Sequence, residues 1–245
     1  MAGLCTGLGA LGVFVVRDLS ENVENGLLAT AAGIMLAATF FSLLLPGIDY
    51  GTARFESATL GAAVVILGLF TGAATLYLIH GSVPHEHFFA GVEGPDSATL
   101  SRIWLFVAAI TLHNFPEGMA VGVGFAGGDV ANGASLATGI GVQNIPEGLA
   151  VAVSLLSVGY RRPYAFGIAF LTGIVEPIGG LLGSAVVSLA APLMPWTLGF
   201  AGGAMLYIIS GEIIPETHRG KSPNVSTAAL LVGFAIMMFL DTTLG

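Results

Sequence analysis

Charged residues are scarce in this chain of 245 residues. Asp, Glu, Lys and Arg together account for 9% of the sequence, whereas apolar residues account for 55%, and the mean hydropathy is +0.89. Soluble domains carry roughly 25% charged residues. The composition therefore excludes an ordinary soluble domain and favours a protein of the lipid bilayer, where a helix needs roughly 20 apolar residues to cross the hydrocarbon.

Basic residues and cysteine are rarer still. The seven Lys and Arg residues are scattered and the net charge is −8, so the sequence offers no basic patch for a nucleic-acid partner. Cys5 is the sole cysteine, which excludes an intrachain disulfide and leaves the redox compartment open. No basic stretch precedes the first apolar run, so we expect no cleaved signal peptide.

Long apolar stretches separated by short polar ones make up the rest of the chain. Their lengths and punctuation predict an all-α polytopic membrane protein, with eight transmembrane helices in a single domain over residues 1–245. The expected helices are about 1–16, 27–48, 57–79, 102–126, 133–158, 164–190, 197–216 and 225–244. The longest connection, 80–101, contains His80, His85, Glu86 and His87.

Eight crossings place both termini on the same side of the membrane, and the basic residues indicate which side. With the termini outside, one basic residue, Arg54, lies outside, and six lie at the inner ends and loops: Arg17, Arg102, Arg161, Arg162, Arg219 and Lys221. Cytoplasmic loops of membrane proteins are enriched in Lys and Arg. We therefore expect external termini and a cytoplasmic 80–101 loop.

An internal repeat links two neighbouring helices. HNFPEGMAVGVGF at 113–125 and QNIPEGLAVAVSL at 143–155 are identical at seven of thirteen positions. The two copies are one crossing apart, so they run antiparallel and form an inverted repeat with its acidic residues near the membrane midplane, where many transporters hold substrate. A packing motif without chemistry is the alternative, but packing alone would not select polar residues.

Each copy of the repeat places nitrogen and oxygen atoms on one helix face, because residues three and four apart are neighbours. Pro116 and Pro146 cannot donate a backbone hydrogen bond, which leaves carbonyl groups available to a cation or to water. The side chains that converge are His113, Asn114 and Glu117 in the first copy, and Gln143, Asn144 and Glu147 in the second.

A third carboxylate, Glu176, stands beside proline and glycine in the segment 164–190. Three buried carboxylates without a nearby Lys or Arg must be protonated or hold cations. Two divalent ions would balance them, and this donor set suits Zn, Fe, Mn or Cd better than Cu(I). Protonation of the acids as the metal leaves would link release of the ion to protons.

Each candidate ligand also has a purely structural interpretation. A histidine in an apolar helix is usually satisfied by a carbonyl group, although His113 has a carboxylate four residues further on. The amides of Asn114, Gln143 and Asn144 can join helices through hydrogen bonds. Met35, taken by itself, fills a core.

The motifs and their order resemble the ZIP (Zrt/Irt-like) family of metal transporters, particularly its bacterial branch. The likeness runs from AAGIMLA at 31–37 through HNFPEG, QNIPEG and EPIGG to EIIPETHR and the closing MMFLDTTLG. It implies an eight-helix transporter of the inner cell membrane with a binuclear site between the fourth and fifth helices. It also implies a dimer, no resident cofactor, and inward movement of zinc or related ions.

The resemblance further implies a role for each matching residue. The first metal would be bound by His113, Glu117, Gln143, Glu147 and Met35, and the second by Asn114, Asn144 and Glu176, with Glu117 and Glu147 bridging the two. Asp49 and Asp241 would gather metal at the outer entrance. Glu212 and Glu216 would line the exit, although an exposed pair of acids one turn apart is the alternative.

The sequence departs from the family pattern in three places along the expected route of the metal ion. Gly211 stands where some bacterial relatives have histidine before the acid of the EIIPE motif, which removes one exit ligand. Asn144 stands where others have aspartate, which removes a charge from the second metal position. The loop has His80, His85 and His87 as candidate ligands, fewer than histidine-rich relatives, so a metal-sensing loop and a merely solvated one both stay open.

Three classes of function fit a buried metal site in a membrane protein. A carrier of Zn, Cd, Fe or Mn is the leading hypothesis. An intramembrane metallohydrolase would need an open water position and a free general base, and the sequence has no His-Glu-x-x-His, so we expect no enzyme activity. A sensor that binds metal without transport is the third.

Overall fold

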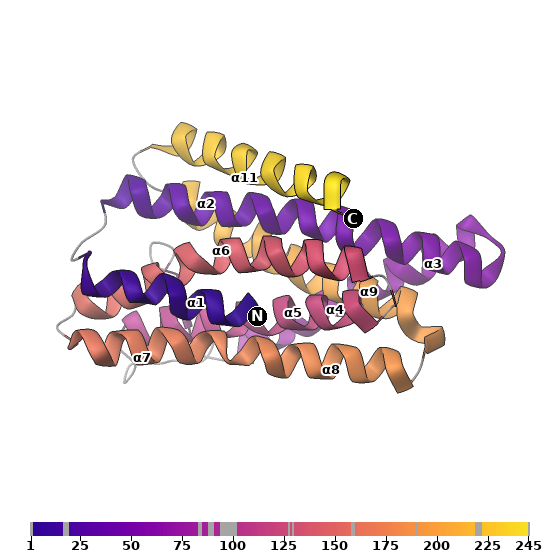
Figure 1. Ribbon diagram of the computed structural model, residues 1–245, viewed down its shortest axis with the longest axis horizontal. Helices are drawn as coiled ribbons and strands as arrows, with labels where there is room; N and C mark the ends of the chain where they lie inside the picture. The colour runs from indigo at the N-terminus through magenta and orange to yellow at the C-terminus, as the bar shows by residue number, and fades with distance from the viewer. Residues whose placement is uncertain are drawn as a thin grey trace.

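The computed structural model describes residues 2–16, 20–82, 85–87, 91–93, 102–126, 128, 130–157, 160–189, 191–218 and 222–244. The helices lie side by side along the longest axis of the molecule (Figure 1). The ends of α1 and α6 and the starts of α2, α7 and α11 lie at the left of this view. Successive rods are therefore antiparallel, as the eight predicted crossings require.

The described elements form eight helical rods, several of which contain a break or a change of helix type. These rods are α1 (Ala2–Ala10) with the 3₁₀ turn η1 (Leu11–Phe14); α2 (Glu21–Ala38), the π-helical η2 (Thr39–Leu44) and α3 (Leu45–Phe55); α4 (Ala58–Ser82); α5 (Arg102–Ala126); α6 (Val130–Ser157); α7 (Arg162–Gly173) and α8 (Val175–Leu189); the 3₁₀ turn η3 (Ala191–Leu193), α9 (Met194–Ile208), the π-helical η4 (Ile209–Ile213) and α10 (Ile214–His218); and α11 (Pro223–Leu244).

The all-α membrane architecture predicted from the sequence is confirmed. Five described stretches are long and apolar enough to cross a bilayer: Asn25–Phe55, Ala58–Ile79, Val130–Leu156, Arg162–Val187 and Pro223–Thr243. The rods of α1, α5 and α9 complete the eight. One small addition was not predicted, a two-stranded antiparallel hairpin of β1 (His85–His87) and β2 (Gly91–Glu93) in the long connection.

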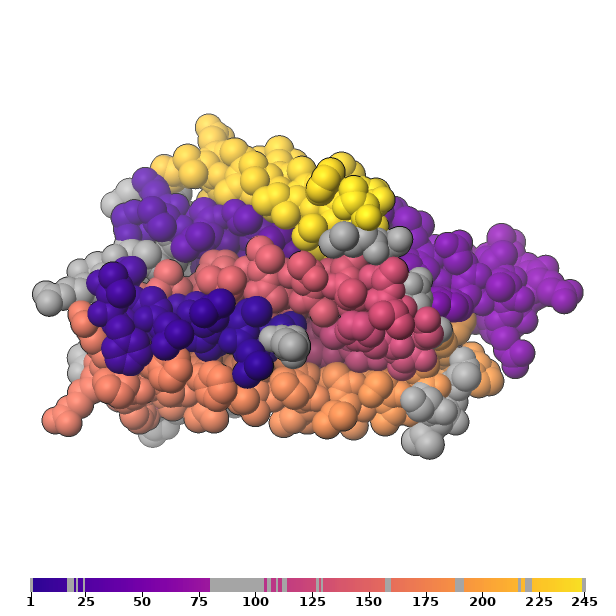
Figure 2. Space-filling view, viewed as in Figure 1, coloured from indigo at the N-terminus to yellow at the C-terminus, as the bar shows by residue number. Residues whose placement is uncertain are grey.

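Helix α6 occupies the centre of the bundle. It packs against α1, α5 and α7 on one side and against α2 and α11 on the other. Figure 1 shows this order, with α11 and α2 above α6 and with α1, α7 and α8 below it. Figure 2 shows that α3 extends beyond its neighbours at one end. A ligand held by α6 can therefore be reached from helices of both groups.

Glycines in the repeated motifs allow the closest helix contacts. A Cβ atom on Gly118 would overlap the backbone oxygen of Glu176, and one on Gly148 would overlap the backbone oxygen of Thr6. Small residues let membrane helices approach each other in this way. Gly118 therefore lets α8 pack closely against α5, and Gly148 lets α1 pack closely against α6.

Candidate metal site

The polar residues of the repeat lie in the middle of α5 and α6, enclosed by helices. Glu117 is fully buried, Glu147 is 2% exposed and Glu176 is 3% exposed. The three amide residues of the motifs are also buried: Asn114, Gln143 and Asn144. Both motif prolines lie inside continuous helices, so neither one ends its helix.

Two neighbouring residues of α6 divide the site into two parts. Gln143 donates a hydrogen bond from Nε2 to Oε1 of Glu117 on α5. Asn144 donates from Nδ2 to Oε1 of Glu176 on α8, at 2.5 Å, and to the backbone oxygen of Ala2, at 3.1 Å. Consecutive helix positions differ by about 100° in direction, which is why adjacent amides reach different partners.

Several buried polar atoms of this site have no hydrogen-bond partner among the described residues. They are both side-chain atoms of Asn114, Oε2 of Glu117, Oε1 of Gln143, Oδ1 of Asn144 and Oε2 of Glu176. Buried polar groups are nearly always bonded, so each exception needs an explanation. Five of the six atoms are oxygens with lone pairs, which is the donor chemistry that binds a divalent cation.

The carboxylates are close enough to repel one another. The Glu117 carboxylate interacts unfavourably with those of Glu147 and Glu176, and Glu176 does so with Glu147. The sequence has no Lys or Arg between Arg102 and Arg161. Within the described residues, no three His, Cys, Asp or Glu side chains are grouped closely enough to hold a metal by themselves. Among the described side chains, amide oxygens are therefore needed beside the carboxylates to form a ligand set.

The two remaining predicted ligands of the first metal lie in α2 and α5. Met35 is fully buried in α2, in the same apolar cluster as Ala120 of α5 and Ile140 of α6. Ala120 lies three positions after Glu117, and Ile140 lies three positions before Gln143. His113 lies in α5, but its side chain is outside the described part of the structure.

A second polar cluster surrounds Asp241 near the end of α11. Its Oδ1 accepts hydrogen bonds from Ser42 of η2, at 2.6 Å, and from Ser135 of α6, at 3.0 Å. Pro46, four residues after Ser42, has no N–H that could donate a helical hydrogen bond to the Ser42 carbonyl. Nδ2 of Asn132 donates to this carbonyl at 3.0 Å. Among the described residues, Oδ2 of Asp241 has no hydrogen-bond partner. The cluster joins three helices around one carboxylate.

The other predicted path residues are distributed along two rods. Asp49 is exposed on α3. Glu212 is buried in η4, whereas Glu216 lies in α10 with its side chain outside the described part. Gly211 is exposed, and a Cβ atom placed there would meet no atom within 4 Å. The side chains of His80, His85 and His87 are likewise outside the described part.

The two serines and the asparagine beside Asp241 were not predicted from the sequence as site residues. A usable signal was present, because Ser135 lies eight residues before Gln143, on the same face of α6. Ser42 lies four residues before Pro46. A proline leaves the carbonyl of the residue four positions earlier without its helical hydrogen-bond donor. Which partners these residues meet depends on the packing of α2, α6 and α11.

The chain is similar to known proteins over its whole length. The model of the ZIP zinc transporter family matches residues 85–241. The zinc transporter GufA of Myxococcus xanthus is 44% identical over 245 residues, covering all of this chain and 96% of the relative. The zinc transporter ZIPB of Bordetella bronchiseptica is 45% identical over 240 residues, covering 98% and 78%. The human zinc transporter ZIP11 is 31% identical over 321 residues, covering 98% and 94%.

Proposed function

Because the chain belongs to the ZIP zinc transporter family, we propose that it moves Zn²⁺ and related divalent ions through the polar centre of the bundle into the cytoplasm. Cd²⁺, Fe²⁺ and Mn²⁺ share enough ligand chemistry with Zn²⁺ to be candidate substrates. The ions are cargo, and the chain catalyses no covalent reaction.

The observation that carries this proposal is the burial of three carboxylates, Glu117, Glu147 and Glu176, with no basic residue nearby in the sequence. An unpaired buried ion costs several kcal/mol, even after the protein relaxes around it (about 3–5 kcal/mol when one partner of a pair is removed). Two divalent ions carry four positive charges, enough to offset the three negative ones. A helix bundle selected for packing alone would not retain these acids.

We propose two ion positions that share the bridging acids. His113, Glu117, Gln143, Glu147 and Met35 would bind the first ion, and Asn114, Asn144 and Glu176 would bind the second. The different directions of Gln143 and Asn144 support this division, since one contacts Glu117 and the other contacts Glu176.

The amides give the site a way to release its cargo. In the structure, Gln143 and Asn144 donate N–H groups to carboxylates, and so partly replace a cation. To bind an ion, each amide would turn about its last side-chain bond and present its oxygen. An arriving ion thus exchanges hydrogen bonds for metal ligands, which lowers the cost of both the loaded and the empty state.

The path would run from the Asp241 end of the bundle to the Glu212 end. We propose that the Asp241 end, with Asp49 and the C-terminal end of α11, faces the outside of the inner membrane. By their sequence positions, six of the seven basic residues fall at the expected inner helix ends and loops, which favours the opposite end as cytoplasmic. Glu212 and Glu216 would then receive the ion, with the 80–101 loop nearby in the cytoplasm.

The resemblance to the family also leads us to propose a homodimer. Exposed apolar side chains on α4 and α11, such as Phe70 and Phe239, offer surfaces that lipid or a second copy can cover. Chemical crosslinking in native membranes tests this proposal, since only a specific pair gives one sharp dimer band.

Uptake by purified protein in liposomes tests the transport proposal. Wild-type protein should accumulate Zn²⁺, and Glu147→Ala should abolish uptake because it removes a bridging ligand. Glu56→Gln provides the control, since this exposed acid at the end of α3 is remote from the bundle centre. Full activity of Glu147→Ala would contradict the site, and no uptake of any of the four metals by wild-type protein would contradict transport.

A further inference from the structure

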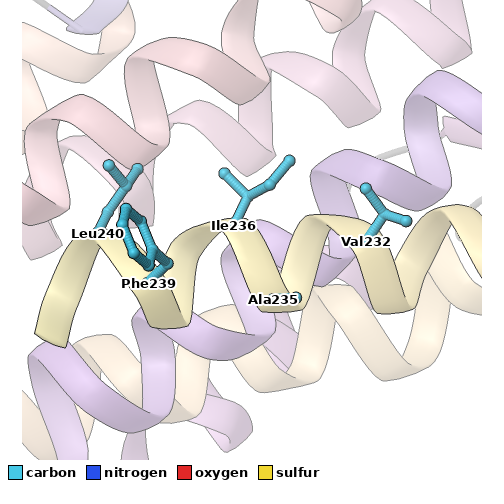
Figure 3. Close-up of a pocket in the computed structure, with 5 residues that line it drawn as sticks. All are labelled: Val232, Ala235, Ile236, Phe239 and Leu240. Carbon is cyan, nitrogen blue, oxygen red and sulfur yellow. The ribbon is translucent and has the colours of Figure 1, made fainter.

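Helix α11 has two faces of different character. Its outer face carries Val232, Ala235, Ile236 and Phe239, which line a shallow apolar groove with Leu240 (Figure 3). Met237 lies on the opposite face and is fully buried, four residues before Asp241. Met238, the next residue, is 40% exposed. The two methionines therefore have different environments, and Met237 points into the bundle.

The thioether of Met237 contacts the central helix at a glycine. A Cβ atom on Gly139 of α6 would overlap the sulfur of Met237 and would lie 2.9 Å from its terminal methyl carbon. The same position is 3.5 Å from Cγ2 of Ile34 on α2. The sulfur thus lies where α2, α6 and α11 meet, and the absence of a side chain at residue 139 makes room for it.

The spacing of residues on α6 places this sulfur between the two polar clusters. Ser135 contacts Asp241, Gly139 contacts Met237, and Gln143 contacts Glu117. These three positions are four residues apart, or about 6 Å of helix rise per step. On α11, Asp241 and Met237 are separated by the same step. Met237 therefore stands about halfway along a line from the Asp241 carboxylate to the central site.

Most side chains of the buried apolar cluster that contains Met237 are hydrocarbon, and Met35, already proposed as a ligand of the first ion, belongs to the same cluster. Ile34, Ala38, Leu136 and Ile140 belong to the same buried apolar cluster as Met237. Of these five side chains, only that of Met237 carries an atom with a lone pair. An ion that leaves the oxygens at Asp241 and passes through this layer would have the thioether as its side-chain ligand.

We propose that Met237 is a selectivity residue, whose sulfur ligates soft divalent cations in transit between the Asp241 cluster and the central site. This inference rests on the proposed transport function and adds a determinant of cargo choice. Thioethers bind soft or borderline ions, whereas Mn²⁺ prefers oxygen. The chain should therefore pass Cd²⁺ in preference to Mn²⁺ partly because of this one sulfur.

The ratio of Cd²⁺ to Mn²⁺ uptake in liposomes tests the proposal. Met237→Leu removes the sulfur at nearly constant volume, which cores tolerate well, and Met238→Leu is the matched control on the outer face. We expect Met237→Leu to lower the Cd²⁺/Mn²⁺ ratio by at least about fivefold, and Met238→Leu to leave it unchanged. Met237→Ile provides a second sulfur-free side chain and should show the same change, should the leucine variant fail to fold.

Three outcomes would overturn the inference in distinguishable ways. If Met237→Leu changes both fluxes by the same factor, Met237 is a packing residue only and the transport proposal is unaffected. If wild-type protein moves Zn²⁺ but neither Cd²⁺ nor Mn²⁺, this inference fails and the transport proposal stands. If wild-type protein moves none of the four metals, both fail.

Discussion

Replacing Asn144 with aspartate should make the stability of the protein depend on metal. Asn144 donates to Oε1 of Glu176 at 2.5 Å. Asn144→Asp removes the donor and places a second carboxylate beside the first. The lost charge-assisted hydrogen bond is worth about 1.5–3 kcal/mol. Repulsion between charges about 3–4 Å apart adds roughly 4–6 kcal/mol at an effective dielectric constant of about 20.

Uptake of a proton by one of the two acids limits this penalty, so we expect a net loss of about 3 kcal/mol without metal. For a chain of this size, that corresponds to a fall in Tm of roughly 6–12 °C. A bound divalent ion reverses the sign, because the new carboxylate becomes a ligand. Zn²⁺ should then raise the Tm of Asn144→Asp more than it raises that of wild type, since a ligand that binds the folded state more tightly stabilises it more.

Thermal unfolding in detergent, with EDTA or with Zn²⁺, measures both effects. Asn224→Asp serves as a control, because Asn224 is exposed at the start of α11. The opposite result would be an Asn144→Asp variant whose Tm matches wild type in EDTA and rises no more with Zn²⁺ than that of wild type. Such a result would mean that residue 144 does not face Glu176 across a metal position.

Three further predictions concern the path and the packing around it. Asp241→Asn should raise the KM for Zn²⁺ with less effect on the maximal rate, since it weakens capture of the ion and leaves the central site intact; uptake measured over a range of Zn²⁺ concentrations separates the two. Gly148→Ala should destabilise the protein by about 1–3 kcal/mol, because its Cβ would overlap the Thr6 backbone oxygen. Gly167→Ala should not destabilise it, because a Cβ there would meet no atom within 4 Å, and thermal unfolding compares the two variants. Gly211→His should fold normally, because the new side chain enters open space. The added imidazole should slow the release of Zn²⁺ at the Glu212 end, and an unchanged release rate in stopped-flow uptake would contradict an exit there.

The eight rods could be predicted because the apolar stretches that cross a bilayer dominate the sequence. Their ends could not be predicted as well. The rod of α2, η2 and α3 runs from Glu21 to Phe55, beyond the expected 27–48, because a helix continues into polar sequence as long as its backbone hydrogen bonds are made. The break at Ile174 was also missed. Pro177 removes the N–H that would bond the carbonyl of Gly173, a constraint that hydropathy does not register.

The candidate site was predicted in its composition and only partly in its arrangement. Polar residues in an apolar helix are visible in any sequence, so Glu117, Glu147 and Glu176 were found at once. The partner of each amide was not predictable, because it depends on whether α5 or α8 faces that side of α6. The partners within the Asp241 cluster and around Met237 depend on contacts among three helices, which no local pattern specifies. The assignment of these residues as metal ligands stays a prediction.

Anomalous X-ray scattering from crystals grown with Zn²⁺ or Cd²⁺ would locate bound ions relative to the three buried carboxylates. We expect strong peaks between α5, α6 and α8, one within ligand distance of Glu117 and Gln143 and a second within ligand distance of Asn144 and Glu176. Crystals in which the metal peaks lie only on the protein surface, with none touching Glu117, Glu147 or Glu176, would contradict the proposed site.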